Sequence, residues 1–273
     1  MAIVNLTPDS FADGGVRVDP DVAIADGLQM VTEGADILDL GGESTRPGAA
    51  PQAADEELRR VLPVIEGLRD RVSVPLSIDT YKAIVAERAI DAGATIVNDI
   101  SALTYDPPLA GVVARRAAAV VLMHNRGRSA DMYARAVYGD VAGEVAAELQ
   151  TRAAAAVAAG VARERIILDP GLGFAKRAEH TFAALAGLPP LAALGFPLLI
   201  GPSRKSFLKL AVGDRPVEDR LWATAGAVAA SVLLGAHIVR VHDVAAMVDV
   251  VRTVDVVLAR GMSGQRAQGT GQR

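Results

Sequence analysis

Three cationic or ionisable side chains, Arg46, Arg240 and His242, lie at or shortly after the ends of apolar stretches typical of buried strands. An arginine guanidinium presents a planar fork of donors that matches two phosphate oxygens at once. One such residue alone is more often part of a surface ion pair. Three of them after comparable stretches could together surround a polyanion, and that is the chemistry we expect of them.

A second polar set follows other apolar stretches and comprises Asn98, Asp169 and Lys205. These side chains offer a mixed donor and acceptor, a pair of acceptor oxygens and a cationic donor. Such a set complements a flat heterocycle with an amidine edge and a carbonyl group, such as guanine or pterin. We therefore expect the site to include a pocket for a flat heterocycle.

Asn5 ends the first apolar stretch of the chain. Its amide oxygen suits a hard cation such as Mg²⁺, which usually keeps waters and phosphate oxygens of the substrate as its other ligands. The alternative is a turn residue that closes the first strand, and Asn5 taken alone favours that role.

Eight apolar stretches could form the strands that bring these residues together. They are rich in Ile, Val and Leu with few polar breaks, which is typical of strands buried on both faces of a parallel sheet. The eight stretches are Ala2–Leu6, Asp36–Leu40, Leu76–Asp79, Thr95–Asn98, Val120–Met123, Ile166–Asp169, Leu198–Gly201 and Ile238–Val241.

Helical patterns separate these stretches at 20–34, 55–71, 81–92, 109–117, 140–159, 217–234 and 244–260, with a short helix near 204–210. Several of them close on a glycine, as a left-handed residue after a helix would: Gly34, Gly93, Gly160 and Gly235. Strands alternating with helices over 273 residues predict an α/β fold, a (β/α)₈ TIM barrel with long loops after strands one and two. An open doubly wound sheet is the alternative, which periodicity alone does not exclude.

In such a barrel, ligands bind at the carboxyl ends of the strands. Every predicted strand ends in a polar or glycine-rich cluster. One cluster alone could simply cap the next helix, as Asp99 and Asp243 could. Eight together favour an active site that spans the rim. We expect one barrel domain over 1–260, and a disordered tail over 261–273, where Gly, Gln, Ser and Arg dominate.

The composition narrows the class of protein. Hydrophobic residues make up 51% and charged residues 22%, so a large core is expected. The net charge of −4 argues against a nucleic-acid partner, and the absence of cysteine excludes disulfides and thiolate metal sites. No uninterrupted apolar stretch reaches the roughly 18–20 residues of a membrane span, and the N-terminus lacks the pattern of a signal peptide. We expect a cytoplasmic protein without a membrane partner.

Seven motifs occur in one order along the chain, and together they resemble those of the bacterial dihydropteroate synthases. The resemblance runs from about Asn5 to about Met247, nearly the whole chain. Any one motif would be weak support, whereas seven in register are highly specific. They are 5–11 (NLTPDSF), 41–48 (GGESTRPG), 77–80 (SIDT), 98–100 (NDI), 169–174 (DPGLGF), 203–207 (SRKSF) and 240–244 (RVHDV).

The resemblance implies a Mg²⁺-dependent transferase of folate biosynthesis, usually a homodimer and a target of sulfonamides. Such an enzyme joins 6-hydroxymethyl-7,8-dihydropterin pyrophosphate to p-aminobenzoate and releases pyrophosphate. By match to the family's motifs, pterin would contact Asp79, Asn98, Met123, Asp169 and Lys205. Gly201 is also expected to be a substrate-binding residue. Pyrophosphate would lie near Asn5, Arg46, Arg240 and His242, with the metal on Asn5. The p-aminobenzoate would contact Phe11, Thr45, Pro47, Phe174 and Ser206.

The reaction implied by this resemblance is dissociative, because loss of pyrophosphate leaves a cation delocalised into the dihydropterin. We expect Asp79 to stabilise that cation, and Lys205, Arg46, Arg240 and His242 to complete the catalytic set. One alternative is a pterin-binding methyltransferase domain, which would keep the pterin residues but has no use for a pyrophosphate site. Another is a catalytically inactive pterin-binding barrel, against which the intact polar residues argue.

Overall fold

Eight parallel strands form the centre of the molecule. The structure is a computed structural model that describes residues 1–7, 19–44 and 48–268, with side chains as far as Arg260. Each strand begins and ends within two residues of its prediction. The strands are β1 Ala2–Asn5, β2 Leu38–Gly41, β3 Leu76–Asp79, β4 Ile96–Asp99, β5 Ala119–Met123, β6 Ile166–Asp169, β7 Leu199–Ile200 and β8 Ile238–Val239.

These strands close into a ring. Strands β1 to β6 pair in sequence order, and β7 pairs with β8. Single parallel bridges join the two groups, from Leu168 to Leu198 on one side and from Ala2 to Val241 at the seam between the first and last strands. At that seam the Ile3 amide donates to the Val241 carbonyl at 3.0 Å. Closure confirms the predicted (β/α)₈ TIM barrel and excludes the open sheet.

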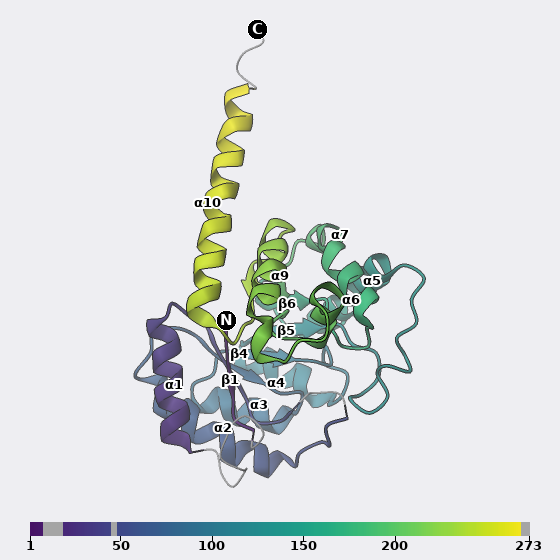
Figure 1. Ribbon diagram of the computed structural model, residues 1–273. Coiled ribbons are helices and arrows are strands. Elements are labelled where there is room, and N and C mark those ends of the chain that lie inside the picture. Colours follow the sequence, from purple (N-terminus) through teal and green to yellow (C-terminus); the bar gives the residue numbers. More distant parts are fainter. Residues whose placement is uncertain (8–18, 45–47, 269–273) are drawn as a thin grey trace.

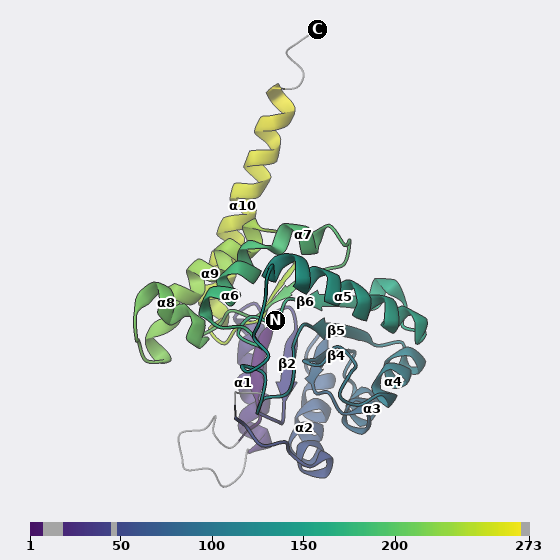
Figure 2. The same ribbon diagram turned by 90° about the vertical axis from the view of Figure 1, so that its right-hand side faces the viewer.

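Helices surround the ring (Figure 1, Figure 2). The long connections predicted after the first two strands are present, since α1 begins only at Pro20 and α2 only at Ala54. The sequence patterns did not indicate α6 and α7, because Gly187, Pro189 and Pro190 interrupt the helical period between them. The helices are α1 Pro20–Thr32, α2 Ala54–Arg69, α3 Ala83–Ala92, α4 Pro108–Arg116, α5 Val141–Ala158, α6 Ala178–Ala186, α7 Leu188–Ala192, α8 Lys209–Val212, α9 Leu221–Leu233 and α10 Val244–Gln268, with one-turn 3₁₀ segments at η2 Arg163–Arg165, η3 Ser206–Leu208 and η4 Glu218–Arg220.

Residues at both ends of α1 explain where this helix begins and ends. Asp19 caps α1 by accepting from the Asp21 amide, and Pro20 occupies the first helical position. Gly34 follows the helix with φ 104°, a conformation that costs glycine little. The other three glycines predicted to end helices, Gly93, Gly160 and Gly235, also have positive φ.

The inside of the barrel divides into an apolar lower part and a polar rim. Met1, Ile96, Val121 and Leu199 are buried together in one cluster inside the ring. Successive side chains of a strand point to opposite faces, so residues two apart share the interior. The pairing register then sets Asn5 beside Gly41, Gly41 beside Asp79, and Asp79 beside Asn98 at the carboxyl ends. The residues predicted to bind substrate or take part in catalysis therefore lie above a layer of buried apolar side chains.

The last helix, α10, packs on α9 and then extends beyond the barrel in both views (Figure 1, Figure 2). It spans Val244–Gln268 and so continues past Arg260, the predicted end of the helix and of the domain. Residues 269–273 of the predicted tail lie outside the described residues, and the domain boundary stays a prediction. Across the described part of the chain, no helix combines the length and the apolar character needed to cross a membrane.

Candidate active site

A guanidinium lies between two carboxylates at the rim of the barrel. Arg240 Nε is 2.6 Å from Asp39 Oδ2, and its Nη2 is 2.8 Å from Asp79 Oδ2. The Asn98 side-chain amide donates to the same Asp39 oxygen at 3.0 Å. The structure thus brings three predicted site residues from β3, β4 and the end of β8 together, and Asp39 orients two of them.

Asp39 is a site residue that the motifs alone did not indicate. It is fully buried in the middle of β2, between Leu38 and Leu40. A buried carboxylate is costly unless it is paired and hydrogen bonded. A lone acid inside an apolar strand therefore signals a partner elsewhere in the fold, and that signal was present in the sequence.

The environment of Asp79 disfavours its charge. Burial raises the pKa of Asp79 to about 7, Arg240 opposes that shift, and the neighbouring carboxylates of Asp39 and Glu57 add to it. One guanidinium shared by two buried carboxylates does not fully compensate both of them. Asp79 is therefore a carboxyl group whose charge depends on pH in the physiological range.

Lys205 and Asp169 interact electrostatically at the rim, at the ends of β7 and β6. Burial lowers the pKa of Lys205 to about 8, while the nearby Asp169 opposes the shift. Burial likewise raises the pKa of Asp169, against the effect of Lys205 and of a hydrogen bond from the Gly171 amide at 2.7 Å. Lys205 Nζ donates to the Leu172 carbonyl at 2.7 Å and lies 4.9 Å from the centre of the Phe174 ring.

Two glycines leave space between the charged groups. A Cβ atom at Gly201 would lie 3.8 Å from Lys205 Nζ and 3.9 Å from Arg240 Cβ, so this position faces both cations. A Cβ at Gly41 would lie 3.6 Å from Asp79 Cβ. Glycine at these two positions keeps side-chain atoms away from the cations and from Asp79, as the heterocycle pocket predicted from the sequence requires.

Other predicted residues lie at the same end of the barrel. His242 Nδ1 is 2.9 Å from Ser203 Oγ, and this contact joins the ends of β7 and β8. Met123 is buried at the end of β5, and Ser206 is exposed at the start of η3. Asp99 does not cap the next helix, since α4 begins at Pro108 without a side-chain cap. Asp99 instead accepts from the amides of Ser101 and Leu103 in the loop that follows β4.

Four predicted residues, Phe11, Thr45, Arg46 and Pro47, lie outside the described residues. Asn5 is described, and it lies half-buried at the end of β1. Nowhere in 1–7, 19–44 or 48–268 do three acidic or histidine side chains gather into a group that could hold a metal ion. An amide oxygen beside the rim carboxylates still suits Mg²⁺ as a single protein ligand, with substrate oxygens and waters completing the shell.

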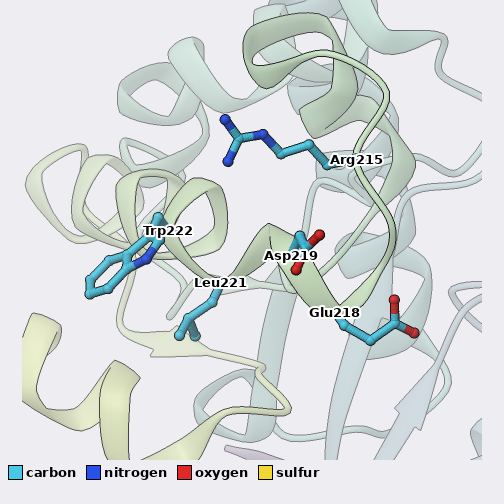
Figure 3. Close-up of a pocket in the computed structure, with 5 residues that line it drawn as sticks. All are labelled: Arg215, Glu218, Asp219, Leu221 and Trp222. Carbon is cyan, nitrogen blue, oxygen red and sulfur yellow. The ribbon is translucent and has the colours of Figure 1, made fainter.

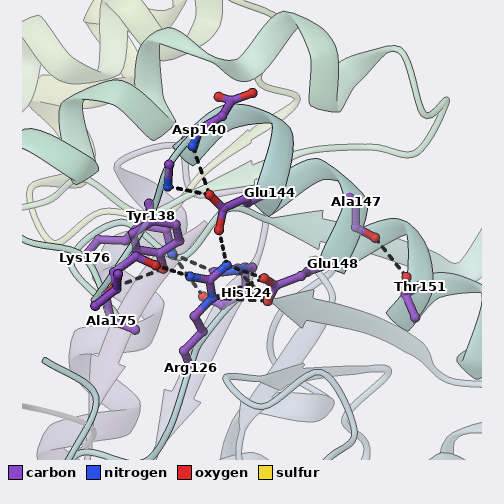
Figure 4. A network of polar contacts seen from close by, with 12 residues as sticks. His124, Arg126, Tyr138, Asp140, Glu144, Ala147, Glu148, Thr151, Ala175 and Lys176 are labelled. Carbon is purple, nitrogen blue, oxygen red and sulfur yellow. Dashed lines mark hydrogen bonds and ion pairs between the residues drawn. The ribbon is translucent and has the colours of Figure 1, made fainter. Parts of the chain in front are cut away.

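A network of polar contacts runs from the end of β5 to α5 (Figure 4). Lys176, only 1% exposed, places its Nζ 2.7 Å from His124 Nδ1. On the other side of the ring, His124 Nε2 is 3.2 Å from Glu148, which also binds Arg126. Burial lowers the pKa of Lys176 to about 7 and also lowers the pKa of His124. The network ties the end of β5 to the segment after β6.

Gly171 marks where that segment touches β5, and it provides a test of the packing. A Cβ atom there would lie 2.0 Å from the His124 carbonyl oxygen, and the residue has φ 67°. We expect Gly171→Ala to lower the free energy of unfolding by roughly 2–4 kcal/mol, through steric overlap and backbone strain. Urea titration followed by circular dichroism measures this change.

Gly213 provides the matched control for Gly171. It has φ 79°, but a Cβ atom there would meet nothing within 4 Å. Gly213 has ψ −176°, a backbone region that is nearly exclusive to glycine, so Gly213→Ala should show a conformational cost without steric overlap, about 1–3 kcal/mol. Equal losses for the two variants would contradict a close contact between Gly171 and His124.

A surface hollow of about 390 Å³ lies at the start of α9, lined by Arg215, Glu218, Asp219, Leu221 and Trp222 (Figure 3). Trp222 is 79% exposed there. None of its lining residues belongs to the strand ends or to the charged pairs described above. The rim residues, and not this hollow, form the candidate active site.

Comparison with known proteins shows the same family along almost the entire chain. The family model described as "Pterin binding enzyme" matches residues 1–242. The dihydropteroate synthase of Synechocystis sp. is 45% identical over 257 residues, which cover 94% of this chain and 89% of that protein. The chain belongs to the dihydropteroate synthase family.

Solved structures agree with this membership. Dihydropteroate synthase of Xanthomonas albilineans with 4-aminobenzoic acid has a TM-score of 0.89 and 44% identity, covering 95% of this chain and 92% of that one. The Yersinia pestis enzyme in a sulfonamide drug complex has a TM-score of 0.89 and 38% identity, covering 95% and 93%. The predicted class, a transferase of the dihydropteroate synthase family in folate biosynthesis, is confirmed.

Proposed function

We propose that this chain condenses 6-hydroxymethyl-7,8-dihydropterin pyrophosphate with p-aminobenzoate by a dissociative substitution at the barrel rim. The observation that carries the proposal is the cluster in which Arg240 lies between Asp39 and Asp79. It places a cation for a leaving anion next to a carboxylate for a developing cation, which is the pair of charges that such a reaction separates.

The dihydropterin ring binds between the two charged pairs. Asn98, held by Asp39, and the carboxylate of Asp169 face its polar edges, and Lys205 donates from the other side. Gly201 supplies room for the ring, and Met123 contributes an apolar surface. This assignment rests on the positions of the five residues at one end of the barrel and on their match to the family's motifs.

The pyrophosphate group binds near Arg240 and His242, together with Arg46. When Mg²⁺ is bound, it supplies charge neutralisation for the leaving pyrophosphate, and Asn5 is its protein ligand. The carbon–oxygen bond to pyrophosphate breaks first and leaves a cation spread over the dihydropterin. Asp79 lies at the end of β3 and forms an ion pair with Arg240. Its negative charge stabilises the cation.

The p-aminobenzoate binds over Phe174 and Ser206, and its amine forms the new carbon–nitrogen bond and then loses a proton. Phe11, Thr45 and Pro47 complete this half of the site by match to the family's motifs. An aryl amine is weakly basic and so is neutral at physiological pH, and it needs no protein base to attack a cation.

The raised pKa of Asp79 predicts a dependence of rate on pH. A carboxyl group with a pKa of about 7 is largely protonated below that value and then cannot stabilise the cation. We expect kcat/KM for the dihydropterin pyrophosphate to fall as the pH decreases from 8 to 5, by about tenfold per unit at the lower end. A pH profile that is flat through this range would remove Asp79 from the ionised catalytic role.

The same shift has the opposite sign for stability. Since the folded protein holds the Asp79 proton more tightly than the unfolded chain, this group stabilises the fold at low pH and loses that contribution as the pH rises through 7. Activity and the contribution of Asp79 to stability should therefore move in opposite directions across neutral pH.

A homodimer is the assembly that we propose. Leu233 of α9 and Val256 and Val257 of α10 are each more than half exposed, on two helices that pack against each other. An exposed apolar surface of this kind is typical of an interface between subunits. Sedimentation velocity measures the assembly state directly, and a monomer at micromolar concentration would contradict this proposal.

One incubation tests the proposed activity. The protein, dihydropterin pyrophosphate, p-aminobenzoate and Mg²⁺ should yield dihydropteroate, which chromatography detects, and pyrophosphate, which a phosphate assay coupled to pyrophosphatase detects. A sulfonamide should compete with p-aminobenzoate. Failure of the folded protein to form product would contradict the proposal.

A further inference from the structure

The segment that follows β6 has an unusual set of hydrogen bonds. The five consecutive carbonyl groups from Gly171 to Ala175 each accept a hydrogen bond from a side chain. The donors, in order, are Lys176 at 3.2 Å, Lys205 at 2.7 Å, Tyr133 at 3.3 Å, Lys176 again at 3.1 Å and Tyr138 at 3.0 Å. We call residues 170–177 the β6 loop.

The backbone conformation explains why side chains are needed. Gly171, Gly173 and Ala175 have φ values of 67°, 80° and 47°, so the chain turns repeatedly in the left-handed region. Such a segment lacks the regular backbone hydrogen bonds of a helix or a sheet, so its carbonyl groups need other donors. The positions of those donors therefore set the shape of the β6 loop.

Two of the donors come from a segment that the motifs did not indicate. Tyr133 and Tyr138 lie on residues 125–139, between β5 and α5, which we call the β5 loop. The Arg126 guanidinium lies 4.0 Å from the centre of the Tyr138 ring, and this cation–π contact helps to hold the ring in place. The β5 loop also meets the second long loop, since the Gly48 amide donates to the Ser129 carbonyl at 3.1 Å.

The β6 loop carries Phe174, whose ring faces Lys205 Nζ at 4.9 Å. Tyr133 binds the carbonyl just before Phe174, and Tyr138 binds the carbonyl just after it. A displacement of either carbonyl would turn the Phe174 side chain. Neither tyrosine hydroxyl bonds to Asp169, Asn98 or Lys205. Lys205 contacts the β6 loop at the Leu172 carbonyl, which neither tyrosine binds, so we expect the pterin half of the site to keep its geometry when either hydroxyl is removed.

We propose that Tyr133 and Tyr138 are positioning residues for the p-aminobenzoate half of the site, acting through the carbonyls on either side of Phe174. The inference rests on the proposed function, in which Phe174 contacts p-aminobenzoate. It extends that site to the β5 loop and gives the loop a part in selecting the second substrate.

The test removes one hydroxyl at a time and compares the two substrates. Tyr133→Phe and Tyr138→Phe should each raise KM for p-aminobenzoate about fivefold, the effect of losing one neutral hydrogen bond. KM for the dihydropterin pyrophosphate should stay within experimental error. Tyr133 is 39% exposed, so its variant keeps the fold even if the variant at the half-buried Tyr138 does not.

Tyr105→Phe is the matched control. Its hydroxyl donates to the Gly127 carbonyl in the β5 loop and to no carbonyl of the β6 loop. Neither KM should change in this variant. Amide hydrogen exchange of a peptide covering 171–176 should quicken in the Tyr133 and Tyr138 variants and remain as in the wild type for Tyr105→Phe.

The outcomes separate the inference from the proposed function. An active wild type whose Tyr133→Phe variant has an unchanged KM for p-aminobenzoate would overturn the inference alone. Equal increases in both KM values would also overturn it, because they would indicate a general disturbance of the site. A folded wild type that forms no dihydropteroate would contradict the proposed function itself.

Discussion

Asp79→Asn should lower turnover on the order of 10²- to 10³-fold while changing the affinity for the dihydropterin little. The amide keeps the size and one acceptor of the carboxylate at the end of β3, but it carries no charge for the developing cation. Because burial already raises the pKa of Asp79, a neutral group at this position is well tolerated by the fold. The melting temperature should therefore stay close to that of the wild type.

Steady-state kinetics and a direct binding measurement with bare pterin distinguish turnover from affinity. Asp99→Asn is the matched control, since Asp99 is also a buried carboxylate at a strand end and burial also raises its pKa, to about 6. Asp99 holds loop amides, so its variant should lose stability and keep its turnover. Unchanged turnover in Asp79→Asn would exclude the proposed role of the charge.

Arg240→Ala should have the largest effect on stability, a loss of roughly 3–5 kcal/mol in the free energy of unfolding. The substitution removes the cation from two carboxylates, of which Asp39 is fully buried. It should also weaken binding of the dihydropterin pyrophosphate more than binding of the bare pterin, because the proposed function places the guanidinium beside the leaving group. Chemical denaturation and calorimetric titration with both ligands measure these two effects.

A second variant separates the two roles of Arg240. Adding Asp39→Asn to Arg240→Ala removes one uncompensated charge, so part of the stability should return. The preference for the pyrophosphate ester should not return, since no cation is restored. Equal losses of affinity for the ester and for the bare pterin would contradict the placement of Arg240 beside pyrophosphate.

The barrel could be predicted from the sequence because buried parallel strands have a composition of their own. All eight strands appear within two residues of the predicted ranges. Strands buried on both faces are mostly apolar, because an unpaired polar side chain there costs free energy, and the polar residues at their ends therefore mark the bounds. The helices α6 and α7 could not be predicted in this way. Two prolines and a glycine interrupt the helical pattern of apolar residues, and packing against α5 stabilises both helices.

The site was predictable wherever a polar residue ends a strand, and less so wherever its partner lies inside one. Asp79, Asn98 and Arg240 could each be named from motifs. The contacts of Arg240 with Asp39 and Asp79, however, depend on the closure of the ring. The contacts of Tyr133 and Tyr138 with the β6 loop depend on how two loops pack, and no local pattern in the sequence encodes that.

The seam of the barrel joins the first strand to the last, and this has a consequence for folding kinetics. Ala2 meets Val241 there, and Arg240 reaches Asp39 and Asp79 from the adjacent position. Contacts so distant in sequence form late, because the loop that they close is long. We therefore expect the cation that neutralises the rim carboxylates to arrive with the last strand, so that the proposed catalytic site is completed in the same step that closes the ring.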